Sequence, residues 1–294
     1  MSRRVASSQA EPVAGTEFAF TDADFQQIAN LVHSNTGIRM PSYKSAMVYS
    51  RLAKRLRALG LASFREYCRL VTDGDGEERQ QMLSALTTNL TSFFRENYHF
   101  EHLARKVLPP LLQAARDGGR VRIWSAGCSS GEEPYSIAIT ILSLMQDAHR
   151  YDIKVLATDI STTVLEKATN GIYAERALAN VPSDQKRRWF EPAKAQDGEP
   201  CMLVGETLRS MVAFRQLNLM HDWPMKGTFQ AIFCRNVVIY FEEETRDRVW
   251  GRFIPLLPVG GYLYIGHSER LGPPATSYLT QEEFTTYRRI GTTA

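Results

Sequence analysis

The feature that most constrains this chain is the segment 124–136, which reads WSAGCSSGEEPYS. A short apolar run at 121–126 gives way to small residues at 127–131, and Glu132, Glu133 and Pro134 then open an apolar run that continues to Met145. This order predicts a strand, a tight turn and a helix. Open α/β sheets use that unit to build a nucleotide-type pocket at the carboxyl end of the first strand.

The charge of the predicted turn narrows the choice of ligand. A phosphate is normally held by the bare amides of a helix N-terminus, where the helix dipole is positive. Glu132 and Glu133 stand at that place and would oppose a phosphate. They suit a cationic, polyhydroxyl ligand, and S-adenosylmethionine, with its sulfonium, ammonium and ribose, has that chemistry. The carboxylates and the missing third glycine disfavour an NAD dehydrogenase.

Composition excludes several classes of protein. The 294 residues exceed one typical domain, and the net charge of +3 does not require a nucleic-acid partner. Four widely spaced cysteines without a C-x-x-C pair indicate a reducing compartment and no metal site. Residues 1–17 predict a disordered leader rather than a signal peptide. No apolar run reaches the roughly 18 residues of a membrane span, so we expect a cytoplasmic protein without membrane insertion.

Two regions with different periodicity follow the leader. Residues 18–90 predict a helical domain. Its first helix is capped by Thr21 or Asp22 and stops at Gly37, and further helices are predicted at 42–59, 63–71 and 77–86. Residues 91–294 alternate strand-like runs (121–126, 153–158, 229–234, 261–265) with helical runs (133–145, 162–169, 243–257). This alternation predicts a mostly parallel sheet covered on both faces. The stretch 172–216 breaks the rhythm and predicts an inserted β subdomain with strands at 201–204 and 211–215, and 278–290 predicts a closing hairpin.

One arc of the second predicted helix is basic: Lys44, Arg51, Lys54, Arg55 and Arg57. This arc has two interpretations, a solvated helix face or a docking surface for an acidic helical partner or for nucleic acid. It lacks the interleaved aromatic residues of single-strand binders, so an acidic protein is the better partner.

Polar residues that follow predicted strands are candidates for ligand contact. Asp159 ends the second strand, where it can accept hydrogen bonds from both ribose hydroxyls or cap the next helix. The preceding small-residue turn favours ribose. Asn218 can pair with an adenine edge or form a turn. Arg235, Asn236 and Tyr240 follow another strand and are candidates for substrate contact at the pocket. The alternative makes Arg235 a surface ion-pair member and Tyr240 a core aromatic.

Two further groups of residues carry weaker signals. The polar and aromatic cluster at 87–95 lies at the junction of the two regions, where pockets are common, although such clusters mostly form loops. The histidines share no metal-ligand spacing, which favours structural or surface roles: His99, His102, His221 and His267.

Several of these segments together resemble the CheR chemotaxis receptor methyltransferases. They are TNLTSFFRE (88–96), AGCSSGEEPYSIA (126–138), ATDIS (157–161), GIY (171–173), IFCRNVVIYF (232–241) and GHSE (266–269). The resemblance covers nearly the whole chain after the leader, in order. It implies a Rossmann-like adenosylmethionine-dependent methyltransferase domain with a mostly parallel seven-stranded sheet, a small all-α N-terminal domain, and an inserted small antiparallel β subdomain.

The resemblance also implies an activity. The family methylates glutamate side chains on the cytoplasmic helices of chemoreceptors, and the products are glutamate methyl esters and S-adenosylhomocysteine. In some members the β subdomain grips a peptide at the receptor's C-terminus, and the loop 191–200 does not reveal which type this chain is. The basic arc would face the acidic helical bundle of the receptor.

Carried over position by position, the cofactor contacts fall at Asn89, Thr91, Arg95, Glu133, Asp159, Asn218, Leu219, Arg235 and Asn236. Arg95 and Tyr240 would lie beside the transferring methyl group. Glu132 and Glu133 are adjacent, so the resemblance leaves open which of them holds the cofactor.

Two rival functions remain. A nucleic-acid methyltransferase usually carries an Asn-Pro-Pro-Tyr type pocket for a flipped base, whereas this chain has RNVV at 235–238. A non-catalytic adenosylmethionine-binding adaptor could keep the same fold. The intact set of Asp159, Glu133, Arg95 and Tyr240 argues against the adaptor.

Overall fold

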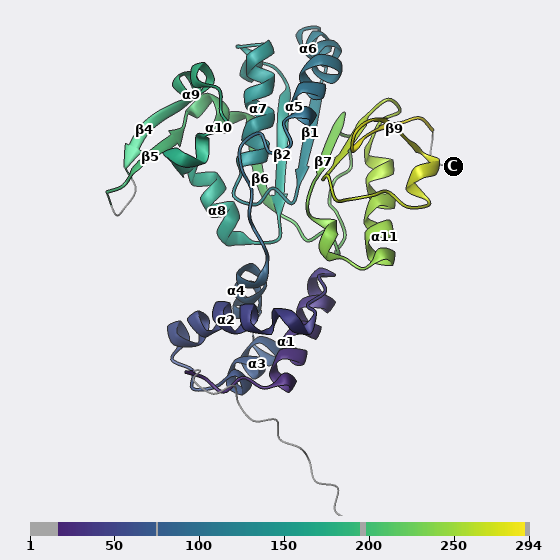
Figure 1. Ribbon diagram of the computed structural model, residues 1–294. Helices are drawn as coiled ribbons and strands as arrows, with labels where there is room; N and C mark the ends of the chain where they lie inside the picture. The colour runs from purple at the N-terminus through teal and green to yellow at the C-terminus, as the bar shows by residue number, and fades with distance from the viewer. Residues whose placement is uncertain (1–16, 75, 195–197, 292–294) are drawn as a thin grey trace, which may run out of the picture. The chain divides into compact units, whose positions relative to one another are not determined.

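The computed structural model describes residues 17–74, 76–194 and 198–291 and divides the chain into two units, 1–87 and 88–294 (Figure 1). Apart from Glu17, the predicted leader lies outside the described residues. None of the helices in the described ranges has the length and apolar character needed to cross a membrane.

The first unit is a helical domain. Thr21 caps the first helix reciprocally: its hydroxyl accepts from the Asp24 amide at 3.2 Å, and its own amide donates to Asp24 Oδ2 at 2.9 Å. Gly37 ends that helix in the left-handed conformation, with φ 72°. The helices close around a core that includes Leu52 and Phe64. Their bounds match the predicted helices closely: α1 (Asp22–Thr36), α2 (Ser45–Leu59, after a 3₁₀ turn at Ser42–Lys44), α3 (Phe64–Asp73) and α4 (Glu77–Leu86).

The second unit is built on a seven-stranded sheet with the order β6-β2-β1-β7-β8-β10-β9. The first five strands in that order pair in parallel, and the last two form the predicted antiparallel hairpin. This result confirms the predicted fold class. The bounds are β1 (Val121–Ala126), β2 (Ile153–Asp159), β6 (Val212–Gln216), β7 (Ala231–Cys234), β8 (Tyr262–Ile265), β9 (Leu279–Glu283) and β10 (Thr286–Arg289).

Helices cover both faces of this sheet because successive strand residues point to opposite sides. Ile123 and Phe233 pack with the helices of one face, and Trp124 and Ile232 pack with Trp250 on the other. The first face carries α5 (Tyr98–His102), the π-helical segment η2 (Leu103–Val107), α6 (Leu108–Arg116), α7 (Glu132–Leu144) and α8 (Thr162–Asn170); the second carries α11 (Glu243–Phe253).

The strand order places the ligand site. Chain connections from β1 run to β2 on one side, whereas β7 pairs with β1 on the other. Connections that leave in opposite directions open a crevice at the carboxyl ends of the two central strands, and open α/β sheets bind ligands there. The segments after β1 and β7 are therefore the first place to look for a site.

The inserted region is smaller than predicted. A separate antiparallel sheet has the order β3-β5-β4, formed by β3 (Ile172–Ala174), β4 (Phe190–Lys194) and β5 (Pro200–Val204), with α9 (Ser183–Trp189) between β3 and β4. The prediction that the strand at 211–215 belongs to this insertion is wrong. That strand corresponds to β6, which follows α10 (Glu206–Met211) and pairs in parallel with β2. A short run with strand-like residues identifies a strand but not its partner.

One side chain connects the small sheet to the turn after β1. The Tyr173 hydroxyl, on β3, donates to the Ser130 carbonyl at 2.6 Å. The same hydroxyl would lie 2.8 Å from a Cβ at Gly131, whose φ of 97° already favours glycine. Because any larger residue at Gly131 would displace Tyr173, the insertion and the turn are fitted to each other.

Candidate active site

The turn after β1 is held against the end of β2. The backbone amides of Gly127 and Cys128 both donate to the Thr158 carbonyl at 2.8 Å. Gly127 has φ 78°, and a Cβ there would lie 2.4 Å from Val237 Cγ2, so the residue after β1 must be glycine. Ser129 is also left-handed, with φ 49°. This turn brings backbone close to the crevice, as a nucleoside pocket requires.

Asp159 stabilises the same turn from the end of β2. Its Oδ2 accepts from the Ser129 amide at 2.8 Å and its Oδ1 from the Ser161 amide at 3.0 Å. The cap of α8 is Ser161, whose hydroxyl accepts from Val164, so the helix-cap interpretation of Asp159 is wrong. Burial raises the pKa of this carboxyl, and the backbone hydrogen bonds oppose that rise. Asp159 therefore joins the turn after β1 to the start of α8.

The two adjacent glutamates at the start of α7 have different partners. Glu132 accepts from the Ser130 hydroxyl at 2.7 Å. Glu133 Oε1 accepts from the Ser125 hydroxyl at 2.7 Å, and its Oε2 pairs with Arg235 at 2.9 Å. Burial raises the pKa of the Glu133 carboxyl, and the Arg235 charge opposes that rise. Glu133 is thus the glutamate that reaches across from β1 to β7.

Arg235 lies at the centre of the site, directly after β7. Its side chain is 2% exposed. One guanidinium nitrogen, Nη1, binds Glu133, and the other, Nη2, donates to the Arg95 carbonyl and pairs with Glu96 Oε2 at 3.2 Å. The guanidinium also lies 5.6 Å from the Phe100 ring centroid. Arg235 is therefore a buried ion-pair member and not a surface one.

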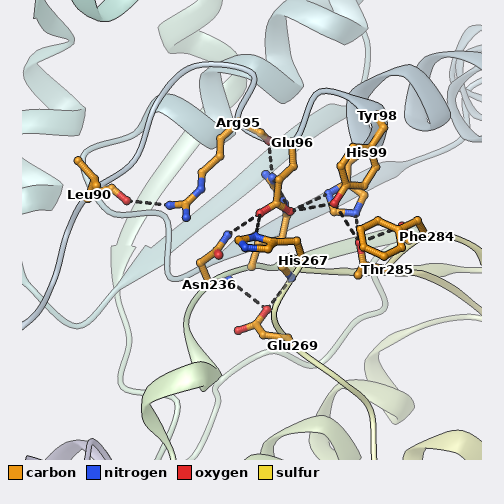
Figure 2. Close-up of polar contacts among 12 residues, drawn as sticks. Leu90, Arg95, Glu96, Tyr98, His99, Asn236, His267, Glu269, Phe284 and Thr285 are labelled. Carbon is orange, nitrogen blue, oxygen red and sulfur yellow. Dashed lines mark hydrogen bonds and ion pairs between the residues drawn. The ribbon is translucent and has the colours of Figure 1, made fainter.

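Glu96 was not among the predicted site residues, yet its carboxylate joins three segments (Figure 2). It pairs with Arg235, and its Oε1 accepts from Asn236 Nδ2 at 3.1 Å and lies 3.0 Å from His267 Nδ1. Burial alone would raise the pKa of Glu96, but the Arg235 charge and the bonds from His267 and Asn236 outweigh it and lower the pKa to about 2. Glu96 is ionised at neutral pH.

A second carboxylate that the prediction did not include fixes the loop after β7. Glu269 accepts four backbone amides, from Gly266 and Asn236 on Oε2 and from Val237 and Val238 on Oε1, at 2.5–3.0 Å. Asn236 has φ 60°. A left-handed non-glycine residue persists where the surroundings hold it, and here Glu96 holds the side chain while Glu269 holds the backbone.

Arg95 also lies in a turn with left-handed non-glycine residues. Its neighbours Phe94 and Glu96 have φ 52° and 56°. Arg95 Nη1 donates to the Leu90 carbonyl at 2.9 Å, which takes one of the five N–H donors of a guanidinium (Figure 2). The Arg95 carbonyl is held by Arg235. The contacts of Glu96 and Arg235 thus fix the turn that presents the Arg95 side chain.

The remaining predicted residues lie at the same end of the sheet or on the segment before α5. The Asn89 carbonyl accepts from the Ser129 hydroxyl at 2.9 Å. Thr91, two residues further along the chain, is half-buried. Asn218 Oδ1 accepts from the Met220 amide at 2.9 Å, so the turn role of Asn218 is present. The buried Leu219 follows it, and Tyr240 ends a 3₁₀ turn after β7. Their roles toward the cofactor stay predictions.

Three members of the predicted basic arc have partners inside the helical unit. Arg51 donates to the Ala85 and Thr87 carbonyls, at 3.1 and 2.7 Å. Arg55 pairs with Glu78, and Arg57 pairs with Glu17 at 2.9 Å. Lys44, the residue before α2, is half-buried, whereas Lys54 lies on α2 and is exposed. Lys54 is therefore the member best suited to a charge test that leaves the domain intact.

Comparison with known proteins places both units in one family. Residues 23–87 match the model described as "CheR methyltransferase, all-alpha domain", and residues 89–288 match "CheR methyltransferase, SAM binding domain". The two matches together span most of the chain.

Curated relatives agree with the family models. The chain is 52% identical to a probable chemotaxis protein methyltransferase of Rhizobium etli, over 88% of this chain and 96% of the relative. It is 43% identical to chemotaxis protein methyltransferase 2 of Pseudomonas aeruginosa, over 90% and 92% of the two chains. Identity to the chemotaxis protein methyltransferase of Escherichia coli is also 43%, over 85% of each chain.

Proposed function

This chain belongs to the CheR family, as an adenosylmethionine-dependent methyltransferase of chemotaxis, and we propose that it methylates glutamate side chains on the cytoplasmic helices of chemoreceptors. The products would be glutamate methyl esters and S-adenosylhomocysteine, formed in the cytoplasm. The buried cluster of Glu133, Arg235 and Glu96 at the β1–β7 crevice carries the proposal, because two carboxylates against one guanidinium suit a cationic cofactor.

The residues present fit that cofactor. Gly127 and the left-handed Ser129 give a turn that approaches a ligand closely. Asp159 and Glu133 are buried acceptors on either side of it, for ribose hydroxyls and for an ammonium group respectively. The bound cofactor supplies a methyl group on a sulfonium, which is an electrophile that needs no metal or redox partner.

The acceptor carboxylate needs no base. A glutamate side chain has a pKa of about 4.3 and is ionised at neutral pH. The work of the enzyme is then orientation and exclusion of water, and orientation alone can supply roughly 7–11 kcal/mol of a barrier. We assign Arg95 to orient the incoming carboxylate and Tyr240 to donate a hydrogen bond to its second oxygen. A tight ion pair would weaken the nucleophile, so Arg95 orients rather than activates.

The substrate class is tested with labelled adenosylmethionine and a panel of receptor cytoplasmic fragments. We expect label on fragments that carry the target glutamates, its release as methanol by mild base, and its loss when those glutamates are changed to glutamine. Base-stable label, or label that survives the glutamine changes, would contradict ester formation on glutamate.

Replacing Arg95 with alanine is expected to lower kcat for receptor methylation at least about 100-fold, because the variant loses the group that orients the carboxylate. Steady-state methylation of a receptor fragment measures the effect. The control is Arg105→Ala, which removes an exposed arginine paired with Glu283 and should keep the wild-type rate. A wild-type kcat for the Arg95 variant would remove this residue from the mechanism.

Docking on the receptor is assigned to the basic arc of α2 and, for a C-terminal receptor peptide, to the small β sheet. Chemoreceptor helices are acidic, and complementary charge raises the encounter rate at low salt. Lys54→Glu should raise KM for the receptor fragment about fivefold, or ~1 kcal/mol, with kcat unchanged. Arg69→Glu, a matched exposed change on α3, is the control. An unchanged KM for Lys54→Glu at low salt counts against this docking surface.

A further inference from the structure

Two carboxylates share a single buried guanidinium at the crevice. Arg235 Nη1 lies 2.9 Å from Glu133 Oε2, and Nη2 lies 3.2 Å from Glu96 Oε2. The side chains are 2% exposed for Arg235 and 10–11% exposed for the two glutamates. With both carboxylates ionised, the cluster holds two negative charges against one positive charge.

The groups around the cluster do not cancel this excess. His99 Nδ1 lies 3.8 Å from Glu96 Oε2, but burial, together with the Arg235 charge, lowers the pKa of His99 to about 3, so its ring is neutral. Asn236 and Tyr98 contribute neutral donors to Glu96, at 3.1 and 3.3 Å. Among the groups that contact the cluster in the described part of the chain, the remaining titratable one is the exposed imidazole of His267, whose Nδ1 lies 3.0 Å from Glu96 Oε1.

The cluster lies at the carboxyl ends of β1 and β7, where the strand order predicts the ligand site. Glu133 also accepts from Ser125, which lies on β1 just before the turn at Gly127. Arg235 follows β7, on the other side of the crevice. A charge at this place is shielded from solvent by both strands, and electrostatic interactions are stronger in such a site than in water.

We propose that Glu96 is a specificity-determining residue for the cofactor. By taking one side of the Arg235 guanidinium it leaves Glu133 incompletely neutralised. The pocket then keeps a net negative charge that favours the cationic methyl donor relative to the neutral product. Adenosylmethionine carries a sulfonium and an ammonium against one carboxylate, whereas S-adenosylhomocysteine lacks the sulfonium and has no net charge.

The test is calorimetric binding of adenosylmethionine and S-adenosylhomocysteine to the full chain at pH 8, without any receptor. Glu96→Gln keeps the shape of the side chain and removes its charge. We expect it to weaken donor binding on the order of tenfold more than product binding. Asp152→Asn, which removes a carboxylate at the amino-terminal end of β2, away from the carboxyl ends of the strands, should leave both affinities unchanged.

Two variants of Glu96 with a shorter side chain separate the effect of charge from the effect of packing. Glu96→Asp shifts the carboxylate but keeps the charge, so the ratio of the two affinities should stay at the wild-type value even where both affinities fall. Glu96→Asn should shift the ratio as Glu96→Gln does, which makes the test independent of the folding of one variant.

Equal losses for donor and product in the neutral variants would overturn the proposal and leave Glu96 with a structural role. The proposal fails equally if Glu96→Asp shifts the ratio as far as Glu96→Asn. The inference rests on the cofactor and not on the receptor substrate. A chain that fails to methylate receptors therefore leaves it intact, whereas a wild-type chain that binds neither ligand contradicts it.

Discussion

Replacing Arg235 with methionine is expected to lower the free energy of unfolding of the sheet-bearing unit by about 3–5 kcal/mol, because removing one partner of a buried ion pair leaves uncompensated buried charge. Here two carboxylates, Glu96 and Glu133, would face each other without the guanidinium between them. The variant would also free the Arg95 carbonyl, which Arg235 holds. Urea denaturation followed by circular dichroism measures the loss.

Two comparisons locate the cause of that loss. Arg120→Met removes an exposed arginine that pairs with Asp152, and exposed pairs contribute little, so its stability should stay within about 0.5 kcal/mol of the wild type. Adding Glu133→Gln to Arg235→Met should recover part of the loss, because one uncompensated charge is removed. A loss of stability below about 1 kcal/mol for Arg235→Met would contradict the prediction that Arg235 compensates the buried charges of Glu96 and Glu133.

Asp159→Asn is expected to weaken S-adenosylhomocysteine binding at least about 100-fold. The carboxylate accepts the Ser129 and Ser161 amides at 2.8 and 3.0 Å, and a carboxamide presents a donor to one of them. It would also remove an acceptor for the ribose hydroxyls. Hydrogen bonds to charged groups contribute about 1.5–3 kcal/mol each, and 100-fold in affinity corresponds to about 2.7 kcal/mol.

Calorimetric titration with S-adenosylhomocysteine measures this effect. Asp152→Asn is the matched control, since Asp152 lies just before β2 whereas Asp159 is its last residue. The Asp152→Asn variant should bind S-adenosylhomocysteine with the wild-type affinity. If Asp159→Asn bound the nucleoside as tightly as the wild type does, the ribose assignment and the role of the turn in the pocket would both be wrong.

Local patterns were the ones that the sequence could reveal. The strand, turn and helix at 121–145 are specified by neighbouring residues, so β1, the glycine turn and α7 were predicted almost to the residue. The reciprocal cap at Thr21 and the left-handed stop at Gly37 are equally local. A short apolar strand such as β6 has no signal for its partner, which is why the prediction places it in the wrong sheet.

The charged centre of the site depends on contacts that are distant in sequence. The partners of Glu96 at Asn236 and His267 lie 140 and 171 residues further along the chain. The one available signal was the place of Glu96 directly after Arg95, in a polar cluster with more donors than a linker requires. Likewise, the bonds of Arg51 to carbonyls at the end of α4 and just after it could not be inferred from the periodicity of α2.

The hydroxyl of Tyr173 has a consequence for how the two sheets behave together. It donates a hydrogen bond to the Ser130 carbonyl and lies beside Gly131, so a shift of β3 would pull on the backbone of the turn after β1. A protein segment that bound the small sheet and displaced β3 would therefore also displace the Ser130 backbone, through the Tyr173 side chain. Displacement of β3 would in this way reach the turn after β1 through the Tyr173–Ser130 hydrogen bond.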